Sequence, residues 1–486
     1  MLKNMNPRLP LAVTLFSVVM AGCGGGGGGA AAPIANTPVV PASVTTYVTG
    51  VITGFGSIII NGVRYESDSA TVSKEGKTAT VADLKTGEVV QIRVEKDSAG
   101  VNHAKAVEQS RLAQGAVEAV DLAANTLTIA GQTILVTVDT IFDPAIAGGA
   151  LAGIAVGDII EVHGFASSTG APQATRIEKA DPADTEIEVT GKVTALDATA
   201  KRFTIGTQVV DYATATLVGL ASSGPADGDL VEVKGTTLLG DGALQAVRVK
   251  KEDGGMQGQK GDSGELGGLV TNFVSVTDFA VNGQKITTDS TTVYVGGVAG
   301  DLKLDAKVEI EGQLDVAGVL VADRVIFKLE STLEIQAPVD AVDTTASTVT
   351  ALGLVFTVNA DTRKEDSVTG NHFFSLADVH AGDYLEVAGY PDTANAGKWI
   401  ATKLELRTTR AKVSIEGLAE QLLSPDFSVG GIAVSTTLST TFKDGNTTLT
   451  QEEFFALTGK RVDVEGTWTG AAPLVATKVK IAGARH

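Results

Sequence analysis

The feature that most constrains the fold of this chain is a unit of roughly 75 residues that recurs along it. A short hydrophobic run ends in glycine six times, and successive glycines are 69 to 77 residues apart. These glycines are Gly62, Gly131, Gly206, Gly283, Gly353 and Gly430. Recurrence at this spacing predicts an array of similar structural units, each with its own small core.

Two further markers follow each hydrophobic run in a fixed order. The first reads Gly-Asp-x-Val-Glu-Val-x-Gly or a variant of it, as at residues 157–164, 228–235 and 382–389. The second reads Ala-x-Arg/Lys-Val, as at residues 246–249 and 322–325. With them the units span residues 47–110, 111–180, 186–253, 265–330, 331–409 and 410–483, and we call these segments repeats 1 to 6.

Each repeat carries the alternating pattern of half-buried strands. In repeat 6, Val462 and Val464 alternate with acidic residues, which is a period of two. Between the third and fourth strands, Thr450 and Glu453 have the spacing of a capping box and Gly459 is placed to stop a helix. Strand-strand-strand-helix-strand-strand is the order of the OB-fold, a small five-stranded barrel.

The predicted fold is therefore all-β. We expect a tandem array of six small OB-like five-stranded β-barrels, some of which carry a short helix between strands 3 and 4. In other repeats the helix is shortened to a turn, as at residues 82–87.

The three markers together resemble the bacterial family called domain of unknown function 5666. The resemblance takes the form of six copies over residues 47–483. It implies an OB-like fold and a lipoprotein context, and it implies no activity.

The N-terminus has the layout of a secretory signal. Lys3 and Arg8 precede an apolar stretch over residues 11–20, which is too short to span a bilayer as a helix. Residues 20–23 resemble the lipobox of bacterial lipoproteins. We therefore predict a signal peptide over residues 1–22, a lipid on Cys23, the single cysteine, and a Gly/Pro-rich tether over residues 23–46.

The same resemblance sets the expected location. Glycine rather than aspartate follows Cys23, which in lipoproteins suggests the outer membrane of a bacterial cell envelope, facing the periplasm or the cell surface.

A glycine-rich segment separates repeats 3 and 4. Glycine recurs there at every third position from Gly255 to Gly267, without the proline that collagen needs. We predict a flexible linker over residues 254–264 that divides the chain into repeats 1–3 and repeats 4–6. A fragment over residues 265–486 is then expected to fold by itself.

The charge balance argues against nucleic acid as a partner. The chain has 38 Lys+Arg against 57 Asp+Glu, a net charge of −19. Proteins that bind nucleic acid need clustered basic residues to neutralise phosphates. An anionic membrane surface is disfavoured for the same reason.

Metal-ligand and catalytic patterns are absent from the sequence. The five histidines have no metal-binding spacing, and solvated or barrel-edge positions are expected for them: His103, His163, His372, His380 and His486. Asp444-Gly445-Asn446 begins like a calcium loop, but Leu449 and Phe455 stand where glycine and glutamate are needed, so a hairpin turn is expected. No phosphate loop, dinucleotide fingerprint or nucleophile elbow is present, and we predict no cofactor.

A row of charges accompanies the fourth and fifth strands. The glutamates alternate with inward-facing valines or isoleucines, so they are expected to point to solvent: Glu161, Glu232, Glu309 and Glu386. The bases of the fifth strand are expected to form cross-strand pairs with acidic residues: Arg176, Arg248, Arg324, Lys403 and Lys478. A feature present in most copies indicates architecture rather than an active site.

These observations favour a non-enzymatic, lipid-anchored cell-envelope protein that acts as a scaffold or interaction module. The alternative is an envelope lipoprotein that binds a glycan or a cation, since OB barrels often bind ligands through aromatic platforms. Trp399 and Trp468 make the C-terminal repeats the place for such a site, although packing at the core or barrel rim explains both residues as well.

Overall fold

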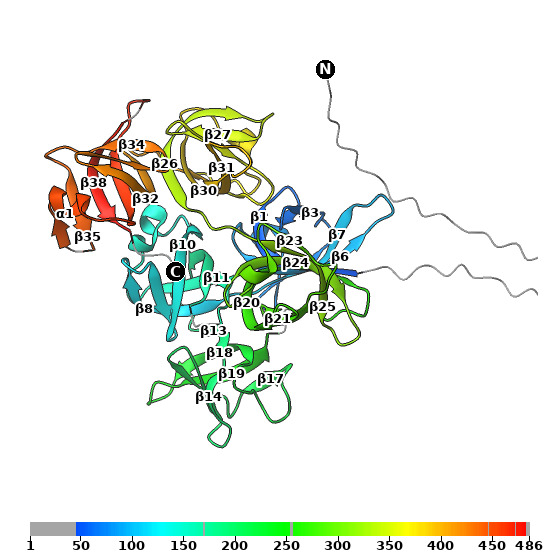
Figure 1. Cartoon of the computed structure of the whole chain (residues 1–486). Coiled ribbons are helices and arrows are strands. Elements are labelled where there is room, and N and C mark those ends of the chain that lie inside the picture. Colours follow the sequence, from blue (N-terminus) through cyan, green and yellow to red (C-terminus); the bar gives the residue numbers. More distant parts are fainter. Residues whose placement is uncertain (1–44, 169–170, 253–255, 446, 472, 483–486) are drawn as a thin grey trace, which may run out of the picture. The chain divides into compact units, whose positions relative to one another are not determined.

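The structure is a computed structural model that describes residues 45–482, except for residues 169–170, 253–255, 446 and 472 (Figure 1). The signal segment, Cys23, most of the tether and His486 lie outside the described residues. In the described part, no helix is long and apolar enough to cross a membrane.

Repeat 5 shows the architecture of the unit clearly. Its five strands are β26 (Leu333–Asp343), β27 (Thr348–Ala351), β28 (Leu354–Thr357), β30 (Tyr384–Pro391) and β31 (Lys398–Arg407). They hydrogen-bond in the order β26-β27-β28-β31-β30 and back to β26, which closes the barrel. Only the β28–β31 pair is parallel. This is the strand order of the OB-fold, as the sequence predicts.

The other repeats are built in the same way. Repeat 1 consists of β1 (Thr45–Gly54), β2 (Ile58–Ile60), β3 (Val63–Tyr65), β6 (Val89–Lys96) and β7 (Asn102–Gln109). Repeat 2 consists of β8 (Ala113–Asp121), β9 (Thr126–Ile129), β10 (Gln132–Phe142), β11 (Ile159–Phe165) and β12 (Gln173–Lys179). In repeat 3 the first strand is β13 (Ile187–Lys192) continued by β14 (Thr194–Asp197), and the others are β15 (Arg202–Ile205), β16 (Gln208–Asp211), β18 (Leu230–Leu238) and β19 (Leu244–Lys251). Repeat 4 consists of β20 (Ser263–Ser275), β21 (Asp278–Val281), β22 (Gln284–Thr287), β24 (Lys307–Leu314) and β25 (Leu320–Phe327). Repeat 6 consists of β32 (Val413–Leu423), β33 (Asp426–Val429), β34 (Ile432–Ser435), β37 (Arg461–Thr467) and β38 (Leu474–Ile481).

Short additional strands extend the barrels. They are β4 (Thr71–Lys74), β5 (Lys77–Ala79), β17 (Thr216–Val218), β23 (Val293–Val295), β29 (Arg363–Asp366), β35 (Thr441–Asp444) and β36 (Thr447–Leu449). β35 and β36 form a hairpin, which is the interpretation given above for Asp444-Gly445 in place of a calcium loop.

The segment before the fourth strand is helical in repeat 6. There α1 (Gln451–Phe455) begins after Thr450, whose hydroxyl accepts a hydrogen bond from the N–H of Glu453 at 3.2 Å. The Glu453 carboxylate accepts from the N–H of Thr450 at 2.7 Å, which completes the capping box. Repeats 1, 4 and 5 have a three-residue 3₁₀ turn at this place.

The recurring glycine of each repeat closes a hairpin between the second and third strands. In repeat 2, Ala130 has φ +47° and Gly131 has φ +64°. Positive φ at both central residues is the geometry of a tight two-residue hairpin whose twist matches that of the strands. This explains why glycine follows the hydrophobic run in every copy.

Barrels pair through shared sheets, and one of the three pairs joins repeats that are not consecutive in the chain. β8 of repeat 2 pairs with β13 of repeat 3, and β26 of repeat 5 pairs with β32 of repeat 6. β1 of repeat 1 runs parallel to β20 of repeat 4, from Thr46 opposite Ser263 to Thr49 opposite Leu266 (Figure 1). The sheets therefore group repeats 1 with 4, 2 with 3, and 5 with 6.

This grouping differs from the division into repeats 1–3 and 4–6. Within the segment expected to be a linker, Met256 is buried in the core of repeat 4, and β20 already begins at Ser263. The sequence pattern defines each barrel, but it carries no information about which strand edges meet.

Candidate functional site

The acidic row on the fourth strands is largely buried, which corrects the sequence prediction. Glu232, Glu309 and Glu386 are only 4, 3 and 3% exposed, and Glu161 is half-buried. The alternation places these side chains outside their own barrel core, as predicted. Neighbouring repeats then cover that face, so the glutamates lie between barrels instead of in solvent.

Most of the predicted cross-strand charge pairs are present. Three bases contact a glutamate of the neighbouring strand: Arg248–Glu232, Arg324–Glu311 and Lys403–Glu386. Arg176 instead contacts Glu178 on its own strand, and Lys478 forms no ion pair within 4 Å among the described residues. The bases of the fifth strand thus serve contacts within and between repeats.

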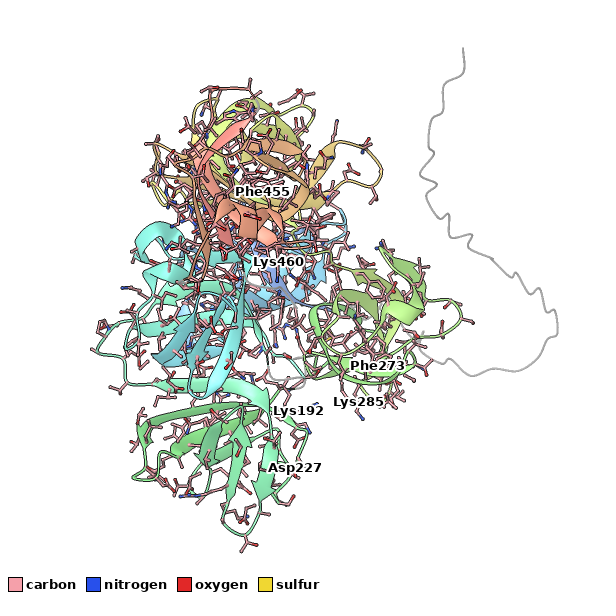
Figure 2. The ribbon with its side chains drawn as sticks, turned by 60° about the vertical axis from the view of Figure 1, so that its left-hand side comes forward. Lys192, Asp227, Phe273, Lys285, Phe455 and Lys460 are labelled. Atoms are coloured by element: carbon pink, nitrogen blue, oxygen red, sulfur yellow. The ribbon has the colours of Figure 1, made fainter. Side chains whose placement is uncertain are left out.

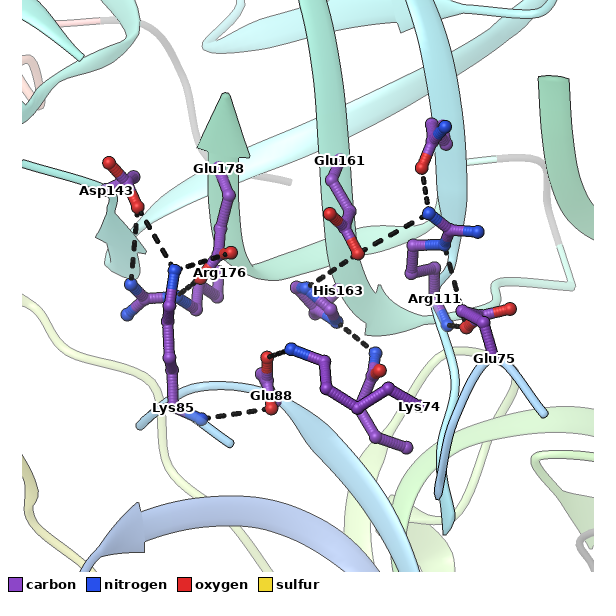
Figure 3. Close-up of polar contacts among 12 residues, drawn as sticks. Lys74, Glu75, Lys85, Glu88, Arg111, Asp143, Glu161, His163, Arg176 and Glu178 are labelled. Carbon is purple, nitrogen blue, oxygen red and sulfur yellow. Dashed lines mark hydrogen bonds and ion pairs between the residues drawn. The ribbon is translucent and has the colours of Figure 1, made fainter. Parts of the chain in front are cut away.

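A dense cluster of such charges lies where repeat 1 meets repeat 2 (Figure 3). Turns and strand ends of repeat 1 supply its lower half in the figure, and β11 and β12 of repeat 2 supply the upper half. We call this cluster the polar junction, and it consists of Lys74, Lys85, Glu88, Asp143, His163, Arg176 and Glu178.

Glu88 is the buried acid that repeat 1 contributes. Its side chain is fully buried, one oxygen accepts from Lys74 Nζ at 2.8 Å, and the other accepts from the backbone N–H of Lys85 at 3.0 Å. Burial raises the pKa of Glu88, although Lys74 acts in the opposite direction. Both carboxylate oxygens therefore have partners within repeat 1.

Arg176 and Glu178 are the central ion pair of repeat 2. They are two residues apart on β12, so they share one face of the strand. Arg176 is 1% exposed and also donates to the carbonyl oxygen of Thr86 in repeat 1 at 3.0 Å and to Glu365 in repeat 5 at 3.3 Å. Lys85 Nζ lies 2.9 Å from Glu178.

The charge state of Glu178 follows from these contacts. Burial alone would raise its pKa, but Arg176, His163 and Lys85 outweigh burial and hold the pKa of Glu178 well below its usual range. The Glu178 carboxylate is ionised in the folded protein, and it binds two bases, Arg176 of repeat 2 and Lys85 of repeat 1.

His163 is fully buried, so the prediction of a solvated or edge position is wrong for this histidine. Its Nδ1 lies 3.0 Å from the side-chain amide nitrogen of Gln109 in repeat 1. Its Nε2 has no hydrogen-bond partner among the described residues and lies 3.9 Å from Glu161. Burial lowers the pKa of His163 to about 3, so the ring is neutral at physiological pH.

The other described histidines divide between the edge and the inside. His103 and His380 have side chains that are 35 and 75% exposed, as predicted. His372 of repeat 5 stacks on Phe55 of repeat 1, with 3.7 Å between the ring centroids.

Three residues of the polar junction have the donor atoms of a metal site. One ligand atom each from Glu88, His163 and Glu178 lies within 4.8 Å of the others, and imidazole with carboxylates is a common set for Zn²⁺. The two carboxylates, however, are already bound by Lys74, Lys85 and Arg176. A cation would have to displace these bases, so the contacts favour an ion-pair network that joins the barrels.

The polar network continues from the junction into repeat 3. Arg111 at the start of repeat 2 donates to Glu188 at 2.9 Å and to Glu186 at 2.6 Å. Lys234 of repeat 3 lies 3.2 Å from Glu188 and also contacts Glu75 of repeat 1. Buried ion pairs thus connect repeats 1, 2 and 3. No sequence spacing could have indicated them, because the partners come from three separate units.

Comparison with known proteins gives the family. The sequence profile described as Domain of unknown function (DUF5666) matches residues 47–108, 114–178, 190–250, 267–326, 336–405 and 416–480. The chain belongs to the DUF5666 family. The six matches coincide with the six repeats, so each barrel is one DUF5666 domain.

Other comparisons add little. No curated protein matches the chain. A solved structure titled drosophila Unr CSD456 is 13% identical and covers 46% of this chain and 97% of its own, with a TM-score of 0.12. At that score the likeness carries no argument about this protein.

The two tryptophans belong to the last pair of DUF5666 domains. Trp399 and Trp468 are partly buried against the shared core of repeats 5 and 6, which is the core or rim packing expected from the sequence. The Trp399 ring lies 6.2 Å from that of Phe356. Trp399 also lines a hollow of about 770 Å³ together with Glu420 and Arg461.

Basic side chains are dispersed over the DUF5666 domains. Lys192, Lys285 and Lys460, labelled in Figure 2, belong to repeats 3, 4 and 6. Many other bases are engaged in the inter-repeat ion pairs described above. This distribution does not resemble the continuous basic track that binds nucleic acid.

Proposed function

We propose that this protein is a non-enzymatic scaffold or interaction protein of the bacterial cell envelope, anchored by a lipid at Cys23. The observation that carries the proposal is that the charged groups of the polar junction make contacts within and between barrels. Glu88, Arg176 and Glu178 are buried between barrels. Glu88 is bonded to Lys74 of its own repeat, whereas Arg176 and Glu178 are bonded to each other and to repeat 1. A catalytic acid or base needs access to a substrate, which these groups lack.

Joining barrels by buried charges favours a defined arrangement of domains. A buried charge is costly unless it meets its partner in good geometry, so repeats that slide or rotate would leave ions unpaired. Buried or partly buried ion pairs of this kind connect repeats 1, 2, 3 and 5, and a fixed arrangement of domains is what a scaffold requires.

The lipid anchor is tested by fractionation of cell envelopes. Cys23→Ser should release the protein from membranes or leave its signal segment uncleaved, because the thiol is the only possible attachment point. Gly22→Ala is the matched control, since it keeps a small residue before the cysteine. Normal processing and membrane association of Cys23→Ser would contradict the anchor.

The non-enzymatic role is tested by the pattern of functional loss in cells. Shortened proteins are expressed in cells that lack the full-length protein. Deleting repeats 5 and 6 together should restore the parental phenotype only in part, and deleting a second pair of repeats should restore less of it. A single substitution that abolishes activity while the protein stays folded would instead favour an enzyme.

A glycan ligand is the second candidate, and Trp399 is the observation that favours it. Its indole lines the 770 Å³ hollow beside Glu420 and Arg461, and aromatic faces with polar neighbours suit sugar rings. Trp399→Ala should then reduce sedimentation of the protein with purified peptidoglycan. Trp468→Ala is the control, because Trp468 does not line this hollow.

A cation remains the third candidate ligand, on the strength of the Glu88, His163 and Glu178 donor set. Zinc titration followed by calorimetry tests it. Binding that His163→Gln abolishes would support a cation site in place of the purely ionic network.

A further inference from the structure

A cavity of about 330 Å³ lies where repeats 1, 2, 4 and 5 meet. Its wall includes Thr53 of repeat 1, Phe165 of repeat 2, Val308 of repeat 4 and Ile400 of repeat 5. The volume falls within the range of sites that hold small organic molecules. No single barrel contains this cavity, so it exists only in the assembled array.

Much of the cavity wall is apolar. Phe165, Val308, Ile326, Phe327 and Ile400 all line it. An apolar ligand body would be favoured here, because each square ångström of apolar surface removed from water contributes about 25 cal/mol.

One of the two acids in the wall is already satisfied. Asp139 is 4% exposed, and its carboxylate accepts hydrogen bonds from the hydroxyls of Ser331 at 2.7 Å and Thr402 at 2.6 Å. Arg363 lies 3.8 Å from the same carboxylate. Asp139 therefore balances Arg363 and offers little to a ligand.

The second acid is also engaged. Asp361 lies 3.5 Å from Lys328 Nζ, and Lys328 in turn lies 2.7 Å from the buried Glu309. Asp361 thus already has a basic partner in Lys328, which it shares with Glu309.

Lys307 is the exception in this wall. Among the described residues, its Nζ forms no hydrogen bond and no ion pair within 4 Å, although it lines the cavity. Burial lowers the pKa of Lys307, and the attraction of Asp139 only partly opposes this effect. An ammonium group held in an apolar wall without a partner is costly, and an anion beside it would remove that cost.

We propose that this cavity binds a small molecule with an apolar body and one carboxylate or sulfonate group, which pairs with the Lys307 ammonium. The apolar wall receives the body of the ligand, and Lys307 supplies the unmatched positive charge. Asp139 and Asp361 do not single out a cationic ligand, because each already lies beside a base, Arg363 and Lys328 respectively. Binding is non-covalent, and the proposal goes beyond the scaffold role without depending on it.

The probe for the test is sodium octanoate, which has one carboxylate and an eight-carbon chain. The chain over residues 24–486, which lacks the cysteine predicted to carry the lipid and keeps all six repeats, is titrated by calorimetry without detergent. We expect saturable binding of one octanoate per chain. Octylammonium and octanol, which lack the anion, should bind at least about tenfold more weakly, the effect of losing a charge-assisted hydrogen bond.

Lys307→Met should weaken octanoate binding by at least about tenfold for the same reason. Lys303→Met is the matched control, since Lys303 belongs to the same repeat, carries the same charge and is exposed. Equal weakening by the two variants would overturn the proposal, because it would reveal a general charge effect.

A second variant keeps the test decisive if Lys307→Met does not fold. Val295 lines the cavity and is 37% exposed, so Val295→Trp reduces the free volume without overfilling a core. Octanoate binding should be lost in this variant while the far-ultraviolet circular dichroism stays unchanged. Octanoate binding that survives Val295→Trp, or no saturable binding to the parent chain, would overturn the proposal.

Discussion

Arg176 shows how one residue joins three repeats. Its guanidinium is buried and contacts Glu178 in its own barrel, a backbone carbonyl of repeat 1 and Glu365 of repeat 5. Arginine suits this role because its planar group has five donors in a fixed arrangement. Arg248 occupies the same place in repeat 3, yet it is 37% exposed and pairs with one glutamate.

The comparison of these two arginines gives the first prediction. Arg176→Met should lower the free energy of unfolding by about 3 kcal/mol, because it leaves Glu178 buried without its main partner. Arg248→Met should cost less than about 1 kcal/mol, as expected for an exposed pair. Urea denaturation followed by circular dichroism measures both, and equal losses would contradict a structural role specific to Arg176.

His163 gives the second prediction, on pH. Its pKa is about 3 in the folded protein and near 6.5 when unfolded, so the unfolded chain binds more protons between these values. The free energy of unfolding should therefore fall as pH drops below 6.5. Between pH 7 and pH 5 the parent should lose about 2 kcal/mol more than His163→Gln.

The variant serves as the reference because other groups titrate in the opposite direction. Burial raises the pKa of Glu405 to about 7 and that of Asp463 to about 6, and protonating these acids stabilises the folded state as pH falls. Both groups are present in the parent and in His163→Gln, so their contribution cancels in the difference. A difference that does not change with pH would mean that the pKa of His163 is the same in the folded and the unfolded chain.

At the residue scale, the sequence predicts which side chains of a strand face the barrel core, but not what covers the side chains on the opposite face. The alternation around Val231 and Val233 correctly places Glu232 off the barrel core. Whether that outer face meets water or another barrel depends on contacts between distant units, which periodicity does not encode. The sequence therefore predicts a solvated or barrel-edge position for His163 and a solvent-facing one for Glu232, and both side chains are buried.

At the element scale, the hairpin between the second and third strands has two uses. In every repeat it provides the tight turn, and in repeat 2 it also contacts the next barrel. Thr207 of repeat 3 donates from its backbone N–H to the carbonyl oxygen of Gly131 at 2.9 Å. A Cβ added at Gly131 would lie 2.5 Å from the backbone nitrogen of Gln208, whereas one added at Gly353 would meet nothing within 4 Å.

The third prediction compares these two glycines. Both have positive φ, so replacement by alanine strains both turns by a similar amount, about 1–2 kcal/mol. Gly131→Ala should cost roughly 1–3 kcal/mol more than Gly353→Ala, because it also pushes repeat 3 away. Thermal unfolding of both variants measures the difference. Identical melting temperatures would show that Gln208 moves away from the added methyl group without a cost in free energy.

Elements were the most predictable part of the molecule. The capping box at Thr450 and Glu453 was visible in the sequence because its signal lies within four residues. The five-strand order was visible because the alternation repeats in six copies. Sheet sharing was not visible, since the edges of β1 and β20 carry no pattern that specifies a partner.

At the scale of the whole molecule, the three pairs of barrels differ in whether the two barrels share one hydrophobic core. Repeats 5 and 6 share one continuous cluster of buried residues, and so do repeats 2 and 3. Repeats 1 and 4 have separate clusters and are joined through the β1–β20 strand pair. Strand β20 of repeat 4 thus has a hydrogen-bonded neighbour in repeat 1, whereas repeats 5 and 6 are joined by a common hydrophobic core.

The fourth prediction concerns the fragments that these pairs define. A fragment over residues 331–483 should unfold in one cooperative step. A fragment over residues 256–483, which keeps Met256 and the whole of β20, should unfold in two steps, repeat 4 first, because β20 has lost β1. Tryptophan fluorescence reports only repeats 5 and 6, since both tryptophans lie there, while circular dichroism reports all three barrels. Coincident transitions in the longer fragment would show that repeat 4 is independent of β1.

The fifth prediction concerns nucleic acid. With a net charge of −19 and dispersed bases, the mature chain should not shift single-stranded DNA or RNA in a gel at physiological salt. Micromolar binding that weakens steeply as salt is added would contradict this prediction.

The pairing of β1 with β20 also implies a delay during biosynthesis, because the two strands are made at different times. The contact between Thr45 and Asp262 at its start spans 217 residues. At roughly 5–20 residues per second, about 10–45 s of translation separates the two strands. During that delay the edge of β1 has unpaired backbone groups, which is a template for pairing with other chains. Covering this edge of the first barrel until repeat 4 has been made would suppress pairing with other chains.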